Sequence, residues 1–456
     1  MKAKFHRFLP AVSLGAMLVS FLSSELVKAE NLQEIFDVAV QKDPEIRGAR
    51  ARYNAAHTVI DQGRSQLMPS LSANLATSRD TSGAADASQD PSGRSKQHSF
   101  DNGYNSHSWG LNLSQALVNF KAWYAYQSAK IGDQSAALTL QQSEQALILK
   151  VAKAYFDVLH SKANLSSFMT EEEAAKQVLA QTRQRFDVGL VAITDVYDSQ
   201  ANADLAAVNR LTEENNLQQK LEALSAITGR PYMEIAGLDK DFPIATLEPA
   251  NVNEWVKIAN ENNLAIKIAQ LDVDSKVQDA KAARSDYLPT VNLVASFNYS
   301  LSGNTASFFP GLAQERSSIG LNFTIPIFTG GLVGARTSQA YYNRDASQEA
   351  LLKSQRDNIQ AARNAYRTVE TDVRAVAARA QSIKSAQSAM DATKVGAEVG
   401  TRNIVDVVLS QRTLFQAQRD YANTRLTFVT DILTLKQAAG VLSPQDVAEL
   451  NQWLKQ

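Results

Sequence analysis

Two carboxylates, Asp195 and Asp406, occupy the same place in two copies of one motif. The copies run VGLVAITDVYDSQ at 188–200 and VGTRNIVDVVLSQ at 399–411, and each places an aspartate six positions after a glycine. A carboxylate in the first turn of a helix interacts favourably with the positive end of the helix dipole. This local role is the one that the residues alone indicate for both aspartates.

The rest of the chain offers no catalytic chemistry. It has no metal-ligand spacing, no nucleophile motif and no phosphate-binding loop. The histidines after residue 29 are scattered: His57, His98, His107 and His160. A net charge of −1 and the lack of a polybasic surface argue against nucleic acid as a partner. We therefore expect neither an enzyme nor a cofactor nor a metal site.

The N-terminus predicts export from the cytoplasm. Lys2, Lys4 and Arg7 precede a short apolar run, and small residues before Glu30 predict a signal peptide over 1–29, cleaved near Ala29. A membrane-anchoring helix is the alternative, but the run is short for a span. The chain has no cysteine, which excludes disulfides and a lipid-modified N-terminal cysteine. No other stretch approaches about 18 apolar residues, so any membrane span would be a β-strand.

The motif belongs to a much longer internal repeat. NLQEIFDVAVQ at 31–41 aligns with NVNEWVKIANE at 251–261, and GLNLSQAL at 110–117 aligns with GLNFTIPI at 320–327. Each copy is predicted to contain a helix, two strands and a long helical hairpin. The first repeat is predicted to span 30–229, with strands 68–82 and 104–118 and hairpin 120–229. The second repeat is predicted to span 251–440, with strands 289–301 and 317–328 and hairpin 332–440. A linker, 230–250, joins the repeats, and a C-terminal segment, 441–456, follows the second.

The strand segments alternate apolar and polar residues over about ten positions, which is typical of strands that cross an outer membrane. A half-buried strand of a soluble sheet is the alternative for any one segment. The polar loops 79–106 and 300–317 follow the outer-membrane pattern of long loops at one end. Closed membrane barrels contain about eight strands or more, and this chain supplies four. An obligate oligomer is therefore predicted.

The long segments 133–188 and 335–395 contain neither glycine nor proline and predict unusually long helices. Each is followed by the VG of the motif and then by a second segment of the same kind. The motif is thus predicted to form the turn of a helical hairpin, once per repeat. The helices are rich in alanine, glutamine, serine and asparagine, as expected for the wall of a water-lined tube.

This order of elements resembles the TolC-like outer-membrane efflux protein family. The matching motifs are spread over essentially the whole chain after residue 29: RFDVGLVAITDV (185–196), VGTRNIVDV (399–407), AYF (154–156), LPT (288–290), IPIFTGG (325–331) and AENL (29–32). The resemblance implies a fold that is mainly α with transmembrane β: a homotrimer with one twelve-stranded barrel, continuous with a long periplasmic helical barrel. A mixed equatorial belt would come from residues near 230–250 and 441–456.

By the same resemblance, the protein would be the exit duct of tripartite efflux or type I secretion systems, passing drugs, toxic compounds or proteins. It would lie in the Gram-negative outer membrane, surrounded by lipid, and extend into the periplasm. Its partners would be a periplasmic adaptor and an inner-membrane pump of the RND, MFS or ABC type. The alternatives are a passive outer-membrane channel, which normally closes a barrel from one chain, and a periplasmic coiled-coil adaptor, which would need Gly-rich β modules.

The resemblance also assigns roles to residues of the two turns. Thr194 and Asp195 would form a latch with Arg402, and Asp406 would ring a closed aperture. The local alternative is that Arg402 and Asp406, four residues apart, pair along one helix. The chain departs from the family pattern at Leu409, where a second ring acid is expected, and at Ala397, where a latch tyrosine is expected. We expect Asp198, in the other hairpin, to replace the missing acid.

The small residues of the turns would allow an adaptor to approach closely. By resemblance, the docking positions are Gly189 and Leu190 in the first turn and Gly400 and Thr401 in the second. Glycine at these places is equally well explained by turn geometry.

Overall fold

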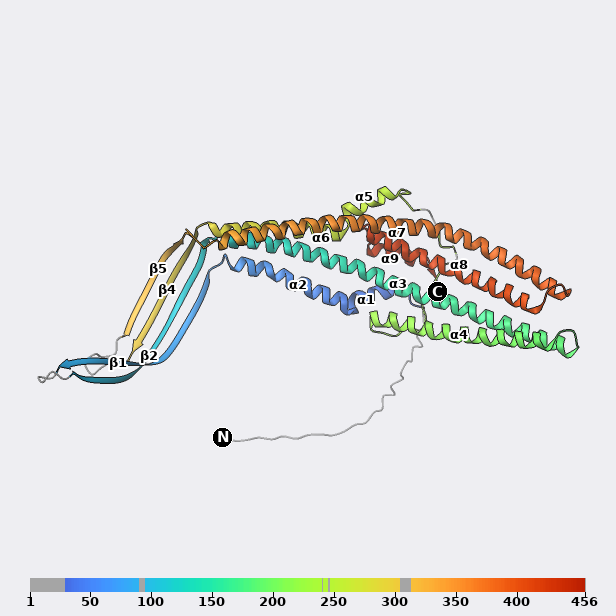
Figure 1. The fold of residues 1–456 in the computed structure, drawn as a ribbon, viewed down its shortest axis with the longest axis horizontal. Helices are drawn as coiled ribbons and strands as arrows, with labels where there is room; N and C mark the ends of the chain where they lie inside the picture. Colours follow the sequence, from blue (N-terminus) through green and yellow to red (C-terminus); the bar gives the residue numbers. More distant parts are fainter. Residues whose placement is uncertain (1–28, 90–94, 240, 245–246, 304–312, 456) are drawn as a thin grey trace, which may run out of the picture.

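A computed structural model describes residues 29–89, 95–239, 241–244, 247–303 and 313–455. The predicted signal peptide falls almost wholly outside these ranges. The described chain forms an elongated rod with strands at one end and two helical hairpins at the other (Figure 1). The same element order occurs twice: paired short helices, two strands and a long hairpin.

One antiparallel sheet holds the four long strands in the order β1-β2-β4-β5. The strands are β1 (Ser70–Gln89), β2 (Ser95–Val118), β4 (Thr290–Ser302) and β5 (Ala313–Thr324). The central pairing joins the two repeats, with Asn112 of β2 opposite Ser296 of β4. Strands β1 and β5 are the two edges of this sheet.

The first strand pair is longer than predicted. The polar segment 79–106 was predicted as a loop, but β1 continues to Gln89 and pairs with β2 as far as Ser95. The backbone ladder does not depend on apolar side chains, so a Gly- and Ser-rich composition does not stop it. In the second pair, β5 ends at Thr324 instead of the predicted residue 328. Pro326 comes two residues later and has no N–H to donate to the ladder.

Two long hairpins form the other end of the rod. Helices α3 (Phe120–Asp187) and α4 (Ile193–Thr228) make the first, and α7 (Leu332–Glu398) and α8 (Ile404–Ala438) make the second. Helix α3 has 68 residues, which at 1.5 Å per residue is about 100 Å. The turns fall where the repeated motif predicts them. Among the described helices, none is both long and apolar enough to cross a membrane.

The single helix predicted at the start of each repeat is broken in two. The pieces are α1 (Leu32–Lys42), α2 (Pro44–Ser65), α5 (Val252–Asn262) and α6 (Leu264–Arg284), and the short helix η1 (Ser285–Tyr287) follows α6. Asp43 caps α2 by accepting hydrogen bonds from the N–H groups of Glu45 and Ile46 at 2.8 and 3.0 Å. Asn263 caps α6 in the same way. A side-chain cap at each break replaces the lost intrahelical hydrogen bonds.

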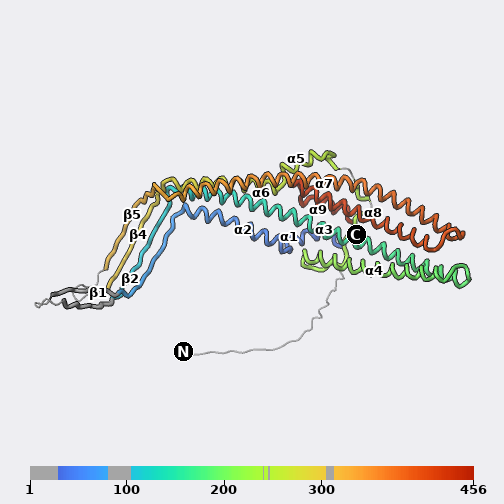
Figure 2. Tube along the Cα trace, in the orientation of Figure 1, coloured from blue at the N-terminus to red at the C-terminus, as the bar shows by residue number. Residues whose placement is uncertain are grey.

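The main core lies around the middle of the rod, where these short helices pack on α3, α4 and α8. Its largest fully buried side chains are Tyr155, Phe156 and Phe428. The two segments predicted to form an equatorial belt meet here: β3 (Gly237–Leu238) pairs with β6 (Leu454–Lys455), beside α9 (Pro444–Asn451). The hydroxyl of Tyr155 donates to the carbonyl of Ala236 at 2.5 Å and fastens the first segment to α3. Figure 2 shows both hairpins running away from this region.

Candidate functional site at the hairpin turns

The first turn is built by the backbone of the motif. Helix α3 ends at Asp187, and Gly189 takes a left-handed conformation with φ of 77°. The N–H of Leu190 then donates to the carbonyl of Arg185 at 2.8 Å, and that of Gly189 to Phe186 at 2.8 Å. This pair of bonds is the Schellman motif, which satisfies the last carbonyls of the helix. Leu190 is left 70% exposed at the tip.

The second turn repeats the same geometry. Gly400 has φ of 79°, and the N–H of Thr401 donates to the carbonyl of Gly396 at 2.8 Å. The hydroxyl of Thr401 donates to the same carbonyl at 3.1 Å. A Cβ added at Gly189 or Gly400 would meet nothing within 4 Å. Both turns therefore have open space around their glycines, and these glycines serve the turn itself.

The two aspartates of the motif lie in the first turns of the returning helices. Asp195 accepts a hydrogen bond from the N–H of Ala192 at 3.3 Å. Asp406 lies three residues after Asn403, whose side chain caps α8 by accepting from the N–H of Asp406 at 2.8 Å. Both positions suit the favourable interaction of a carboxylate with the helix N-terminus. The helix-dipole interpretation thus accounts for both aspartates within one chain.

Arg402 pairs locally. Its Nη1 lies 3.7 Å from Oδ2 of Asp406 on the same helix, and the two side chains are 63% and 38% exposed. Thr194 is exposed at the start of α4. Within the described part of the chain, no ion pair or hydrogen bond joins Arg402 to Thr194 or Asp195. One protomer therefore brings the predicted latch residues to the same end of the rod without joining them.

Asp198 faces a groove between the two hairpins. The groove has a volume of about 280 Å³ and lies between α4 and α8, with Asp198 on one side and Arg412 on the other. Its apolar lining includes Leu205, Ile404 and Val408. Arg412 was not anticipated from the sequence, because the motif ends at residue 411 and nothing in its spacing indicates which way residue 412 points. Leu409, at the place of the expected acid, is exposed.

Further from the turns, one ion pair joins the two hairpins and another joins the two arms of the first hairpin. Arg419 of α8 lies 2.6 Å from Glu171 of α3 and stacks over the ring of Phe168 at 4.2 Å. Arg210 of α4 lies 2.6 Å from Glu172. Sequence reasoning missed these ion pairs because the partners are separated by up to 248 residues.

A pair of carboxyl groups joins the arms of the second hairpin, Asp372 on α7 and Asp431 on α8. Burial, the hydrogen bond to Asp431 and its charge together raise the pKa of Asp372 to about 6. Burial also raises the pKa of Asp431, although the hydrogen bond from Asp372 and the nearby Lys153 act in the opposite direction. Both carboxyl groups thus hold a proton to higher pH than an isolated aspartate does.

In the described ranges, no group of three or more histidine, aspartate or glutamate side chains is arranged to hold a metal ion. The described residues of the turns can therefore act through their charges and through the shape of the tips.

A duplicated rod with a four-stranded sheet and two open helical hairpins defines a class of elongated channel-forming proteins, and comparison with known proteins identifies the family. The sequence matches the family "Outer membrane efflux protein" over residues 35–230 and 255–441, one match in each repeat. The chain belongs to this family.

Relatives and solved structures agree with this membership. The outer membrane protein TolC of Salmonella enteritidis is 35% identical over 99% of this chain and 89% of that protein. The protease secretion protein PrtF of Dickeya chrysanthemi is 23% identical over 96% of this chain and 94% of that protein. The fold is similar to that of VceC from Vibrio cholerae, with a TM-score of 0.74, 17% identity and coverage of 90% of this chain and 96% of that one. The chain is accordingly an outer-membrane channel protein.

Proposed function

We propose that this chain is the outer-membrane exit duct of tripartite efflux systems, type I secretion systems or both. It would pass drugs, toxic compounds or proteins from an inner-membrane pump of the RND, MFS or ABC type across the periplasm. One observation carries the proposal: a four-stranded sheet with two unpaired edges runs directly into two helical hairpins, one of which contains a helix of 68 residues. Such a molecule can enclose a conduit only together with copies of itself.

The assembly that suits this shape is a homotrimer. Strand β1 of one protomer would pair with β5 of the next, so that no edge meets lipid. The alternation along β5 supports a lipid-facing surface: the large apolar residues Ile319, Leu321 and Phe323 share one face of the strand and are 77%, 53% and 64% exposed in the single chain. Residues 30–229 and 251–440 would then form two equivalent parts of one wall. Residues 1–29 would be the removed signal peptide.

The hairpin turns would form the periplasmic end and its gate. Three copies of Asp406 around an aperture would produce a cation-attracting ring. Arg402 would leave its local partner to meet Thr194 and Asp195 of a neighbouring hairpin, because a surface pair at this spacing is worth only about 0.2–0.5 kcal/mol. Asp198 would add a second acid near the aperture in place of the one missing at Leu409.

The open tips would receive the periplasmic adaptor at Gly189, Leu190, Gly400 and Thr401. The space around both glycines supports close approach of a helical tip. A photo-crosslinking side chain at Leu190 or Thr401 should bond to the cognate adaptor in cells, and one at the exposed Asp391 of α7 should not. Equal yields at all three places would argue against docking at the turns.

Deletion of the gene tests the function as a whole. A strain without this protein should become sensitive to bile salts, dyes or antibiotics, or should lose secreted proteins, and the intact chain should restore both. Fractionation should place heat-sensitive trimers in the outer membrane. Normal resistance and secretion in the deleted strain would overturn the duct, and a monomer in the periplasmic fraction would indicate an adaptor.

A further inference from the structure

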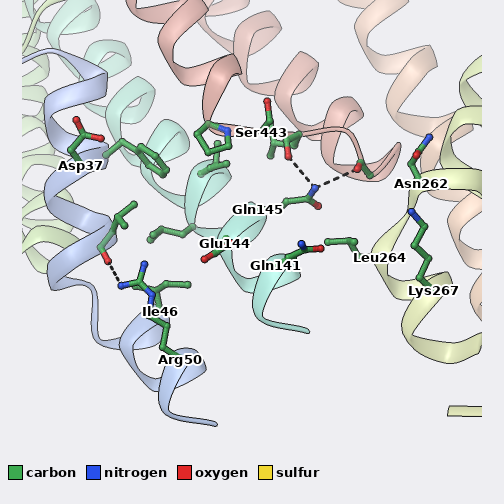
Figure 3. Close-up of a pocket in the computed structure, with 17 residues that line it drawn as sticks. Asp37, Ile46, Arg50, Gln141, Glu144, Gln145, Asn262, Leu264, Lys267 and Ser443 are labelled. Carbon is green, nitrogen blue, oxygen red and sulfur yellow. Dashed lines mark hydrogen bonds between the residues drawn. The ribbon is translucent and has the colours of Figure 1, made fainter. Parts of the chain in front are cut away.

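A cavity of about 610 Å³ lies at the middle of the rod, far from both turns. Four parts of the chain line the cavity (Figure 3). They are the α1–α2 break, one face of α3, the α5–α6 break and the turn between α8 and α9. Small-molecule sites in proteins typically measure about 300–1,000 Å³ and are largely pre-formed. The size and the fixed walls of this cavity fall in that class.

The inner lining of the cavity is apolar. Phe36, Ile46, Leu147, Ile148 and Leu442 contribute to it, and all five side chains are buried. The turn that closes one wall is held in place, because Nε2 of Gln145 donates to the carbonyls of Gly440 and Leu442 at 3.4 and 3.0 Å. An apolar portion of a ligand would therefore be favoured inside without rearrangement of the walls.

The charged side chains at the rim are balanced in sign. Two are acidic, Asp37 and Glu144, and two are basic, Arg50 and Lys267. Asp37 accepts from Nε2 of Gln33 at 2.9 Å, and Arg50 donates to the carbonyl of Val40 at 3.0 Å. Glu144 and Lys267 come from different helices, α3 and α6, and stand apart in Figure 3. Among the described residues, neither side chain has an ion-pair or hydrogen-bond partner, and both side chains are exposed.

Charged side chains next to the cavity, by contrast, do form ion pairs. Lys150, one and a half turns along α3 from Glu144, lies 2.9 Å from Asp43 and 2.8 Å from Glu45. Lys436 pairs with Asp446 beside the same turn. The junction therefore pairs its structural charges, while the exposed side chains of Glu144 and Lys267 lie at the mouth of the apolar space.

We propose that this cavity binds a small zwitterionic amphiphile, with its ammonium at Glu144, its carboxylate at Lys267 and Arg50, and its apolar body on the buried lining. A short apolar peptide with free termini has this chemistry. An ion of one sign would bring a like charge close to part of the rim, and an uncharged molecule would leave both Glu144 and Lys267 unpaired. The site is independent of the gate and of the cargo, so it does not rest on the proposed duct function.

Calorimetric titration of the detergent-solubilised full-length protein with trileucine tests the proposal. Saturable binding is expected, and blocking both termini as acetyl-trileucine amide should weaken it at least about tenfold, since hydrogen bonds to charged groups are among the stronger ones. The near-isosteric variants Glu144→Gln and Lys267→Met should each weaken binding of trileucine about tenfold. Gln141→Trp, which would fill the cavity from an exposed lining position, should abolish it.

Two matched variants outside the cavity serve as controls. Glu222→Gln on α4 and Lys384→Met on α7 remove exposed charges of the same types and should leave the affinity unchanged. Circular dichroism and trimer mobility of every variant would show that folding is intact. Absence of saturable heat would overturn the site. Equal affinity for the blocked peptide, or wild-type affinity in both Glu144→Gln and Lys267→Met, would overturn the zwitterionic ligand.

Discussion

At the scale of single residues, the arginine of the second turn has two competing partners. Arg402 lies 3.7 Å from Asp406 in the single chain, yet the proposed gate requires it to leave for a neighbouring hairpin. If it does, Arg402→Ser should loosen the closed tip and raise the single-channel conductance in planar bilayers several-fold. Arg363→Ser, an exposed arginine of α7, is the control. Unaltered conductance in Arg402→Ser would mean that Arg402 pairs only with Asp406 and does not hold the tip closed.

The groove between α4 and α8 predicts opposite effects for its two charged residues. Asp198→Asn should weaken the block of conductance by multivalent cations, because it removes one negative charge per protomer near the aperture. Arg412→Gln, across the same groove, should strengthen that block by removing a neighbouring positive charge. The measurement is the concentration of a trivalent cation that halves the current. An unchanged block in Asp198→Asn would make Asp198 an ordinary solvated charge.

The carboxyl pair of the second hairpin predicts a pH dependence of stability. The pKa of Asp372 is raised from 3.8 to about 6 in the folded chain by burial and by Asp431. Between these values the folded state binds more protons than the unfolded state, so stability falls as pH rises from about 4 to 6. Asp372→Asn should therefore stabilise the protein at pH 7 by on the order of 1 kcal/mol and flatten this dependence. Thermal melts at pH 5 and 7, with Glu349→Gln as the control, measure both effects.

Residues within one motif were predictable, and residues that meet across the fold were not. The glycine turns and the first-turn positions of Asp195 and Asp406 follow from local spacing, because a Schellman turn and a helix start involve only a few consecutive residues. The Arg419–Glu171 pair joins helices whose relative rotation is set by packing along their whole length. A single sequence contains no local signal for that rotation.

At the scale of elements, the order and the turns of the long helices were predicted, and the breaks near the equator were not. The helical pattern of 31–66 continues across residue 43, so periodicity alone favoured one helix. The Asp43-Pro44 pair is the overlooked signal, since aspartate is a preferred N-cap and proline a preferred first helical residue. Asn263 gives a weaker signal in the second repeat. Both breaks help to form the cavity of about 610 Å³ at the middle of the rod.

The equivalent glycines at the ends of α4 and α8 predict unequal tolerance of alanine. Gly229 and Gly440 both have positive φ, 73° and 74°, so alanine costs about 1 kcal/mol at either place. A Cβ at Gly440 would also lie 2.6 Å from the backbone of Asn262, whereas one at Gly229 would meet nothing within 4 Å. Gly440→Ala should therefore cost about 1–3 kcal/mol more and lower the temperature at which trimers dissociate. Equal melting of the two variants would contradict the close packing at the α5–α6 break.

At the scale of the whole molecule, the sheet decides how protomers assemble, and the absence of cysteine from the sequence permits a direct test. Asn74 on edge strand β1 and Ser318, Gly320 or Asn322 on edge strand β5 lie on the more polar side of each strand. If β1 pairs with β5 of a neighbour, oxidation of Asn74→Cys combined with a cysteine at one of the three β5 positions should give covalent trimers, because paired strands bring Cα atoms within disulfide reach. Non-reducing electrophoresis measures this cross-linking, and single-cysteine variants should stay unlinked.

The double variant Asn112→Cys, Ser296→Cys provides the internal control for oxidation, because these residues lie directly opposite each other on β2 and β4. If that control forms its disulfide but none of the three β1–β5 combinations gives linked trimers, the sheet edges do not meet. The conduit would then have to close in another way.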